Sequence, residues 1–120
     1  MRVQCSPQGL AAYSHIPGNS FLKEGKEYVV LEVFSPYNRP AEFRLEPIEG
    51  EEPALFDCRF FTVTSSSIPP TWRYFLLEGG SFFLCPEPWR RIGFWEDFYD
   101  HVPEAVRTYN SEKRSILAYS

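Results

Sequence analysis

The sequence predicts an α+β protein: a small curled antiparallel sheet or SH3-like barrel of five to seven strands, followed by one or two C-terminal helices. Residues 1–85 contain several short segments rich in β-branched and aromatic residues, which favour strands. A Gly-Gly pair at residues 79–80 separates two of these segments, as in a tight β-hairpin. Beyond Pro86 the apolar residues follow the period of a helix instead.

Length and composition predict one domain spanning residues 1–120. A chain of 120 residues fits a single core. Its 43% hydrophobic and 18% aromatic residues supply enough apolar surface to build that core. We expect residues 1–85 to be mainly strands and residues 86–120 to be mainly helical.

Two longer segments of the first half are typical of strands. Residues 26–34, KEYVVLEVF, are rich in β-branched and aromatic side chains, and so are residues 55–63, LFDCRFFTV. Each is expected to form one strand. Further strands around Val3 and Tyr13 are left open, because nearby proline and glycine residues interrupt the pattern.

Residues 42–46, EFRLE, alternate strictly between apolar and charged side chains. This alternation predicts a half-exposed antiparallel strand, with Phe43 and Leu45 facing the core and Arg44 facing solvent. The hairpin around residues 79–80 should have a two-residue loop, because glycine adopts the positive φ angles that such turns require.

Residues 94–100 predict an amphipathic helix. At 100° per residue, four aromatic side chains fall within one arc; they are Phe94, Trp95, Phe98 and Tyr99. Three carboxylates occupy the opposite side: Glu96, Asp97 and Asp100. One helical segment can therefore hold both groups.

A second helix is expected from Pro103 onward. Proline fits a first helical turn, and Glu104 complements the positive end of the helix dipole. Five apolar residues share one face of this helix: Ala105, Val106, Tyr109, Ile116 and Leu117.

The charge pattern argues against nucleic acid as a partner. The formal net charge is −4 and the pI is about 5.2, so no general basic field attracts a phosphate backbone. Acidic residues gather in two places, at residues 49–52 and at residues 96–100. Such clusters suit a basic protein partner, and they also suit a merely solvated surface.

The cysteine and histidine content indicates no active site. Cys5, Cys58 and Cys85 have neither CxxC nor CxxH spacing, so we expect no disulfide framework and no zinc site. His15 and His101 lie in unrelated contexts. We therefore expect a protein that is not an enzyme and that has no metal and no cofactor.

The cellular location is expected to be the cytoplasm. The N-terminal residues lack the apolar core of a signal peptide. No run approaches the roughly 18 apolar residues of a membrane span, so no membrane association is expected.

The C-terminal half resembles a family of small bacterial proteins. The segments SSIPPTWRYF and CPEPWRRIGFWEDFYDHVPEAVRTYNSEKRSIL, within residues 66–117, are similar to a pattern of IPxxW, PxPW and GFWExxxD motifs followed by a Pro-Glu-Ala helix. Proteins with this pattern resemble immunity partners of interbacterial toxins. The resemblance implies a non-catalytic protein that neutralises a cognate toxin by occluding its active or binding surface.

The expected partner contacts combine aromatic anchors with carboxylates, as in strong interface centres. They are Trp72, Trp89, Trp95, Glu96, Asp97, Tyr99 and Asp100. For Trp72 and Trp95 a structural role is the stronger alternative, in which each closes the core and its indole N–H donates to a backbone carbonyl.

A second function remains open. The chain would also suit an SH3-like adaptor or regulatory module that binds a peptide or protein at an exposed sheet edge or an aromatic groove. The sequence does not decide the oligomeric state.

Overall fold

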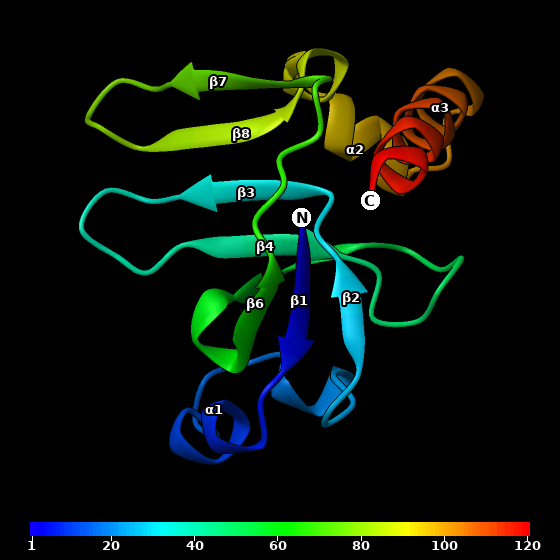
Figure 1. The fold of residues 1–120 in the computed structure, drawn as a ribbon. Helices are drawn as coiled ribbons and strands as arrows, with labels where there is room; N and C mark the ends of the chain where they lie inside the picture. The colour runs from blue at the N-terminus through cyan, green and yellow to red at the C-terminus, as the bar shows by residue number, and fades with distance from the viewer.

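The computed structural model describes residues 1–120, which form eight strands and three α-helices (Figure 1). The strands are β1 (Arg2–Cys5), β2 (Glu27–Val29), β3 (Glu32–Ser35), β4 (Glu42–Leu45), β5 (Ala54–Asp57), β6 (Phe61–Ser65), β7 (Trp72–Leu76) and β8 (Phe82–Pro86). The α-helices are α1 (Pro7–Ala12), α2 (Phe94–Tyr99) and α3 (Pro103–Tyr119). Three short 3₁₀ turns are η1 (Asn19–Phe21), η2 (Cys58–Phe60) and η3 (Glu87–Arg90).

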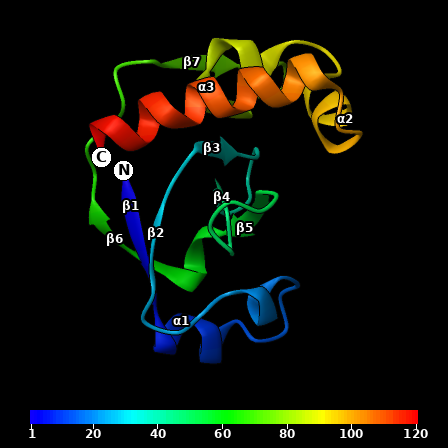
Figure 2. The same cartoon turned by 90° about the vertical axis from the view of Figure 1, so that its right-hand side faces the viewer.

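The strands form two antiparallel sheets, with the orders β2-β1-β6 and β5-β4-β3-β8-β7. The sheets contact each other through aromatic residues: the ring centroid of Phe61 in β6 lies 5.9 Å from that of Phe43 in β4. Helix α2 covers the five-stranded sheet, where Trp95 lies over Arg44, and α3 runs from α2 across the top of the molecule to the N-terminus of β1 (Figure 2). The predicted α+β class with C-terminal helices is confirmed, with eight strands in two sheets.

The segment 26–34 contains two strands instead of the single one that we expected. The chain leaves the three-stranded sheet after β2 and enters the five-stranded sheet at β3, and the linking residues Val30 and Leu31 are both buried. The amide of Leu31 donates to the carbonyl of Arg44 at 2.8 Å. A continuous apolar run therefore marks a corner between sheets here.

The segment 55–63 is also divided, into β5, η2 and β6, so the expectation of one strand is wrong. The carboxylate of Asp57 accepts a hydrogen bond from the amide of Arg59 at 2.9 Å, which favours a turn over extended backbone. The prediction treated Asp57 as an ordinary strand residue.

The N-terminal segment contains β1 around Val3 and a helix, α1, where a strand around Tyr13 had been left open. Ser6 caps this helix by accepting from the amide of Gly9 at 3.1 Å. Gly9 is required, because a Cβ atom there would lie 2.4 Å from the carbonyl oxygen of Arg59.

The hairpin of β7 and β8 is confirmed, but its loop has three residues instead of two. The amide of Leu77 donates to the carbonyl of Ser81 at 2.8 Å, which leaves residues 78–80 as the loop. Gly79 and Gly80 have φ angles of 88° and 97°, as the sequence predicted.

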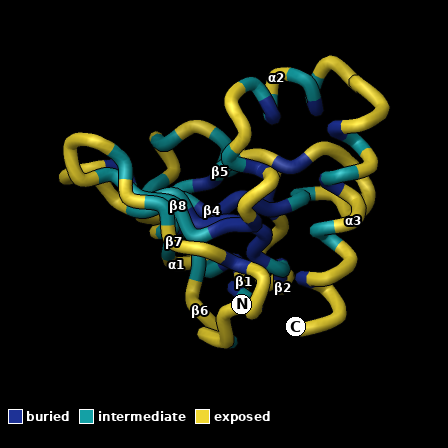
Figure 3. Tube along the Cα trace, turned by 90° about the horizontal axis from the view of Figure 1, so that it is seen from above, coloured by how far each residue is buried: buried dark blue, intermediate teal, exposed yellow.

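The two predicted helices are confirmed as α2 and α3. Phe94 and Phe98 of α2 are buried, and so are Ala105, Tyr109 and Ile116 of α3. Leu117 was expected on the buried face but is 44% exposed, whereas its neighbour Ile116 is fully buried, because successive residues point about 100° apart around a helix. Figure 3 shows the resulting contrast between the buried centre and the exposed outer turns of α3.

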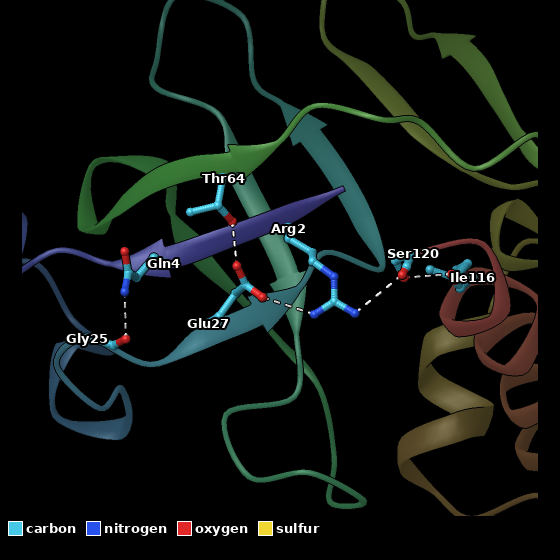
Figure 4. Close-up of polar contacts among 7 residues, drawn as sticks. All are labelled: Arg2, Gln4, Gly25, Glu27, Thr64, Ile116 and Ser120. Atoms are coloured by element: carbon cyan, nitrogen blue, oxygen red, sulfur yellow. Dashed lines mark hydrogen bonds and ion pairs between the residues drawn. The ribbon is translucent and has the colours of Figure 1, made fainter.

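The chain termini meet where α3 ends beside the three-stranded sheet (Figure 4). The guanidinium of Arg2 donates to the carboxylate of Glu27 at 3.1 Å and to the carbonyl of Ser120 at 3.4 Å. Thr64 donates to the same carboxylate at 2.9 Å. These contacts connect α3 to both outer strands of the three-stranded sheet.

Candidate interaction surface

The three tryptophans have different environments. Trp89 is 1% exposed and lies at the centre of an aromatic cluster, with ring centroids 5.3 Å from Trp95 and 5.4 Å from Tyr109. Trp72 is 6% exposed. Both side chains therefore offer almost no surface to a partner, although the sequence had suggested them as contacts.

Burial of Trp72 agrees with its predicted core role, but the hydrogen bond predicted with it is wrong. The indole N–H groups of Trp72 and Trp89 are both buried without a hydrogen-bond partner. An unpaired buried N–H costs stability, so the burial of the large apolar indole surface must offset this cost at both positions. Trp95 is only half-buried.

Beneath Trp95 lies an ion pair that the sequence did not reveal. The Arg44 Nε donates to Oε2 of Glu32 at 2.7 Å, and Glu32 is fully buried. The prediction that Arg44 faces solvent is wrong, because α2 covers that face of the five-stranded sheet. The guanidinium lies 3.8 Å from the ring centroid of Trp95 and donates to the hydroxyl of Tyr99 at 3.3 Å.

Tyr99 joins α2 to the connection between β4 and β5. Its hydroxyl accepts from Arg44 and donates to the carbonyl of Pro53 at 2.5 Å. Burial raises the pKa of Tyr99, and the neighbouring Arg44 partly opposes this shift. The phenol therefore stays protonated and keeps donating to the connection at neutral pH.

The carboxylates of α2 lie on its outer side, as predicted. Glu96 and Asp100 are exposed and make no ion pair, whereas Asp97 is partly buried and accepts from Arg91 at 3.1 Å. Next to Asp100, the Nε2 atom of His101 lies 3.1 Å from the carboxylate of Glu52. The fold therefore brings the two acidic clusters, at residues 49–52 and 96–100, onto one surface.

A groove of about 1060 Å³ lies between residues 46–56, η1 and the helices α2 and α3, and the carboxylates of Glu96, Asp97 and Asp100 lie outside its lining. Its apolar lining includes Phe21, Ile48, Pro53, Phe98, Tyr99 and Val106. Phe21 and Ile48 are 69% and 58% exposed, and Glu51 and Glu52 also line the groove. We call this groove, whose lining carboxylates are Glu46, Glu51 and Glu52, the acidic groove.

One end of the acidic groove is fixed by Glu46. Its carboxylate accepts from the hydroxyl of Tyr109 at 2.5 Å and from the Nζ of Lys113 at 2.9 Å. Burial, followed by this hydrogen bond, raises the pKa of Tyr109. The three residues connect α3 to the end of β4.

Sequence reasoning found the carboxylates but missed the groove. The only available signal was Ile48, an aliphatic residue within an acidic segment. Its exposure follows from the position of the β4–β5 connection against α2, which no local pattern specifies.

The structure contains no group of three or more His, Cys, Asp or Glu side chains placed to hold a metal ion. The three cysteines are free: Cys5 and Cys85 are buried, and Cys58 is partly buried. No α-helix has both the length and the apolar character needed to cross a bilayer.

Comparisons with protein-family models, curated proteins and solved structures found no match to this chain. Function must therefore be inferred from the geometry of its own residues.

Proposed function

We propose that this chain is a non-catalytic cytoplasmic binding protein, and most specifically an immunity protein that neutralises a cognate bacterial toxin by occluding its active or binding surface. The observation that carries the proposal is the meeting of two acidic clusters beside an apolar groove. Exposed apolar side chains surrounded by charge are typical of interface centres.

The surface favours a basic protein with an apolar protrusion. Glu96 and Asp100 have no cationic partner within the chain, so they are free to pair with lysine or arginine. Phe21 and Ile48 would contact the protrusion. Toxins that act on nucleic acids carry basic grooves, and complementary charge accelerates association with such surfaces.

The proposal is tested by capturing partners with the tagged protein at low and at high salt. We expect one stoichiometric partner, encoded by the neighbouring gene, whose toxic activity is inhibited on binding. Binding should weaken as salt is raised, because exposed charge pairs are screened.

Matched variants show whether the acidic groove and the neighbouring carboxylates of Glu96 and Asp100 form the contact. Glu96→Lys with Asp100→Lys should weaken binding, whereas Glu24→Lys with Glu78→Lys changes the net charge equally at exposed sites elsewhere. Ile48→Asp should also weaken binding. A partner whose binding is unchanged both by Glu96→Lys with Asp100→Lys and by Ile48→Asp binds elsewhere, and this result would refute the proposed surface.

An adaptor is the second candidate, because a groove of this size also suits a short peptide. The two candidates differ in what they require of the partner. An adaptor would bind an isolated basic peptide and leave the activity of its source protein unchanged, whereas an immunity protein must inhibit its partner.

A further inference from the structure

Strand β7 forms an edge of the five-stranded sheet (Figure 1). The amide of Leu77 donates toward β8, and antiparallel strands alternate the direction of their backbone groups. The backbone N–H and C=O groups of Arg73 and Phe75 therefore point to β8, whereas those of Tyr74 and Leu76 point to the free edge. Such unpaired groups are ready to accept another strand.

The two faces of β7 differ in chemistry. Tyr74 and Leu76 are 58% and 65% exposed on one face. Arg73 and Phe75 occupy the opposite face, because side chains alternate along a strand. Phe83 pairs with Phe75 in the register, so it shares that second face.

Beside the free edge lies a hollow of about 860 Å³, formed by β7, η3 and the residues after η3. Arg90 and Arg91 line the hollow, together with one acidic residue, Glu87. The guanidinium of Arg90 lies 4.0 Å from the ring centroid of Phe83, on the same face as Arg73.

The arginines give this edge a charge opposite to that of the whole protein, whose formal net charge is −4. Neither Arg73 nor Arg90 pairs with a carboxylate, whereas Arg91 donates to Asp97. Arg73 donates to the carbonyl oxygens of Pro70 and Trp72 at 2.9 and 3.1 Å, which leaves its charge uncompensated. Two cations without a carboxylate partner beside an open strand edge favour an anionic extended segment.

We propose that β7 binds an extended acidic segment of another protein by β-augmentation. Its backbone pairs with Tyr74 and Leu76, and its carboxylates contact Arg73 and Arg90. Its alternate, apolar side chains cover the exposed face of β7. The segment therefore alternates between apolar and acidic residues, and this site is separate from the acidic groove.

The test uses the full chain and a blocked peptide of alternating valine and glutamate, labelled with fluorescein. A peptide in which lysine replaces glutamate is the control. Fluorescence anisotropy should detect binding of the glutamate peptide only. Amide resonances of Tyr74 and Leu76 should shift in two-dimensional NMR spectra of the complex.

Charge reversal by Arg73→Glu with Arg90→Glu should weaken binding of the glutamate peptide by about tenfold and create binding of the lysine peptide. Arg107→Glu with Arg114→Glu is the matched control, since both residues are exposed on α3 and make no ion pair. This control should bind like the unmodified chain.

Leu76→Pro removes an outward N–H without removing a bond to β8, and edge strands tolerate proline at such positions. We expect about fivefold weaker binding and an unchanged far-ultraviolet circular dichroism spectrum. Equal binding of the two peptides, unchanged binding after Arg73→Glu with Arg90→Glu, or shifts confined to the acidic groove would each overturn the proposal.

Discussion

Replacing Arg44 by methionine provides the sharpest test of the packing between α2 and the sheet. Glu32 is 0% exposed and Arg44 is 7% exposed, and their closest atoms are 2.7 Å apart. The substitution keeps much of the side-chain volume but leaves a carboxylate buried without its cation. It also removes the guanidinium from beneath Trp95 and the hydrogen bond to Tyr99.

The expected loss of stability is large for a single substitution. Breaking a buried ion pair by removing one partner costs about 3–5 kcal/mol, a sizeable part of the roughly 5–15 kcal/mol that holds a typical domain folded. Replacing both charged residues, by Glu32→Leu with Arg44→Met, should recover most of this loss, because neither ion is then left unpaired.

Urea unfolding followed by tryptophan fluorescence measures these free energies, and the Glu32→Leu variant completes the double-mutant cycle. Hydrogen exchange of the α2 amides provides a local readout, which should accelerate in Arg44→Met and recover in the double variant. A loss below about 1 kcal/mol in Arg44→Met, or a double variant no more stable than the single one, would refute the reasoning.

Three further predictions follow from burial. Trp89→Ala should cost about 3–5 kcal/mol in urea unfolding and more than Trp95→Ala, since Trp95 is only half-buried; a larger loss for Trp95 would contradict this order. Burial raises the pKa of Tyr109 above the value of about 10 that tyrosine has in the unfolded chain. The fold therefore keeps its full stability below a pH of about 10 and loses stability as pH rises further, because the unfolded chain releases this proton first. Tyr109→Phe should therefore flatten the dependence of stability on alkaline pH, and an unchanged slope would argue against a buried phenol. Burial raises the pKa of both Cys58 and Cys85, so a disulfide reagent should label the native protein slowly and at Cys58 alone, and native labelling of Cys85 would show that its strand opens.

Local patterns predicted the elements that depend on local interactions. The period of residues 94–100 placed four aromatic side chains on the inner side of α2 and three carboxylates on the opposite side, and the structure agrees. The hairpin at residues 79–80 could also be predicted from the sequence, because its turn needs positive φ angles, which favour glycine.

Features that depend on distant parts of the chain could not be predicted from local patterns. The alternation of residues 42–46 is compatible with an exposed outer face, but α2, some fifty residues later, covers Arg44. Glu32 lies within an apolar strand, and nothing near it in sequence indicates an arginine on the neighbouring strand. The position of Ile48 likewise depends on contacts between the β4–β5 connection and Tyr99.

These distant contacts determine how α2 presents its carboxylates. A helix of six residues is not stable alone in water, so its orientation must come from tertiary contacts. Arg44 holds its inner side through Trp95 and Tyr99, and Arg91 holds its outer side through Asp97. A surface fixed in this way loses little conformational entropy when a partner binds. The buried ion pair therefore contributes to binding without touching the partner, because it keeps the free carboxylates of α2 in one arrangement.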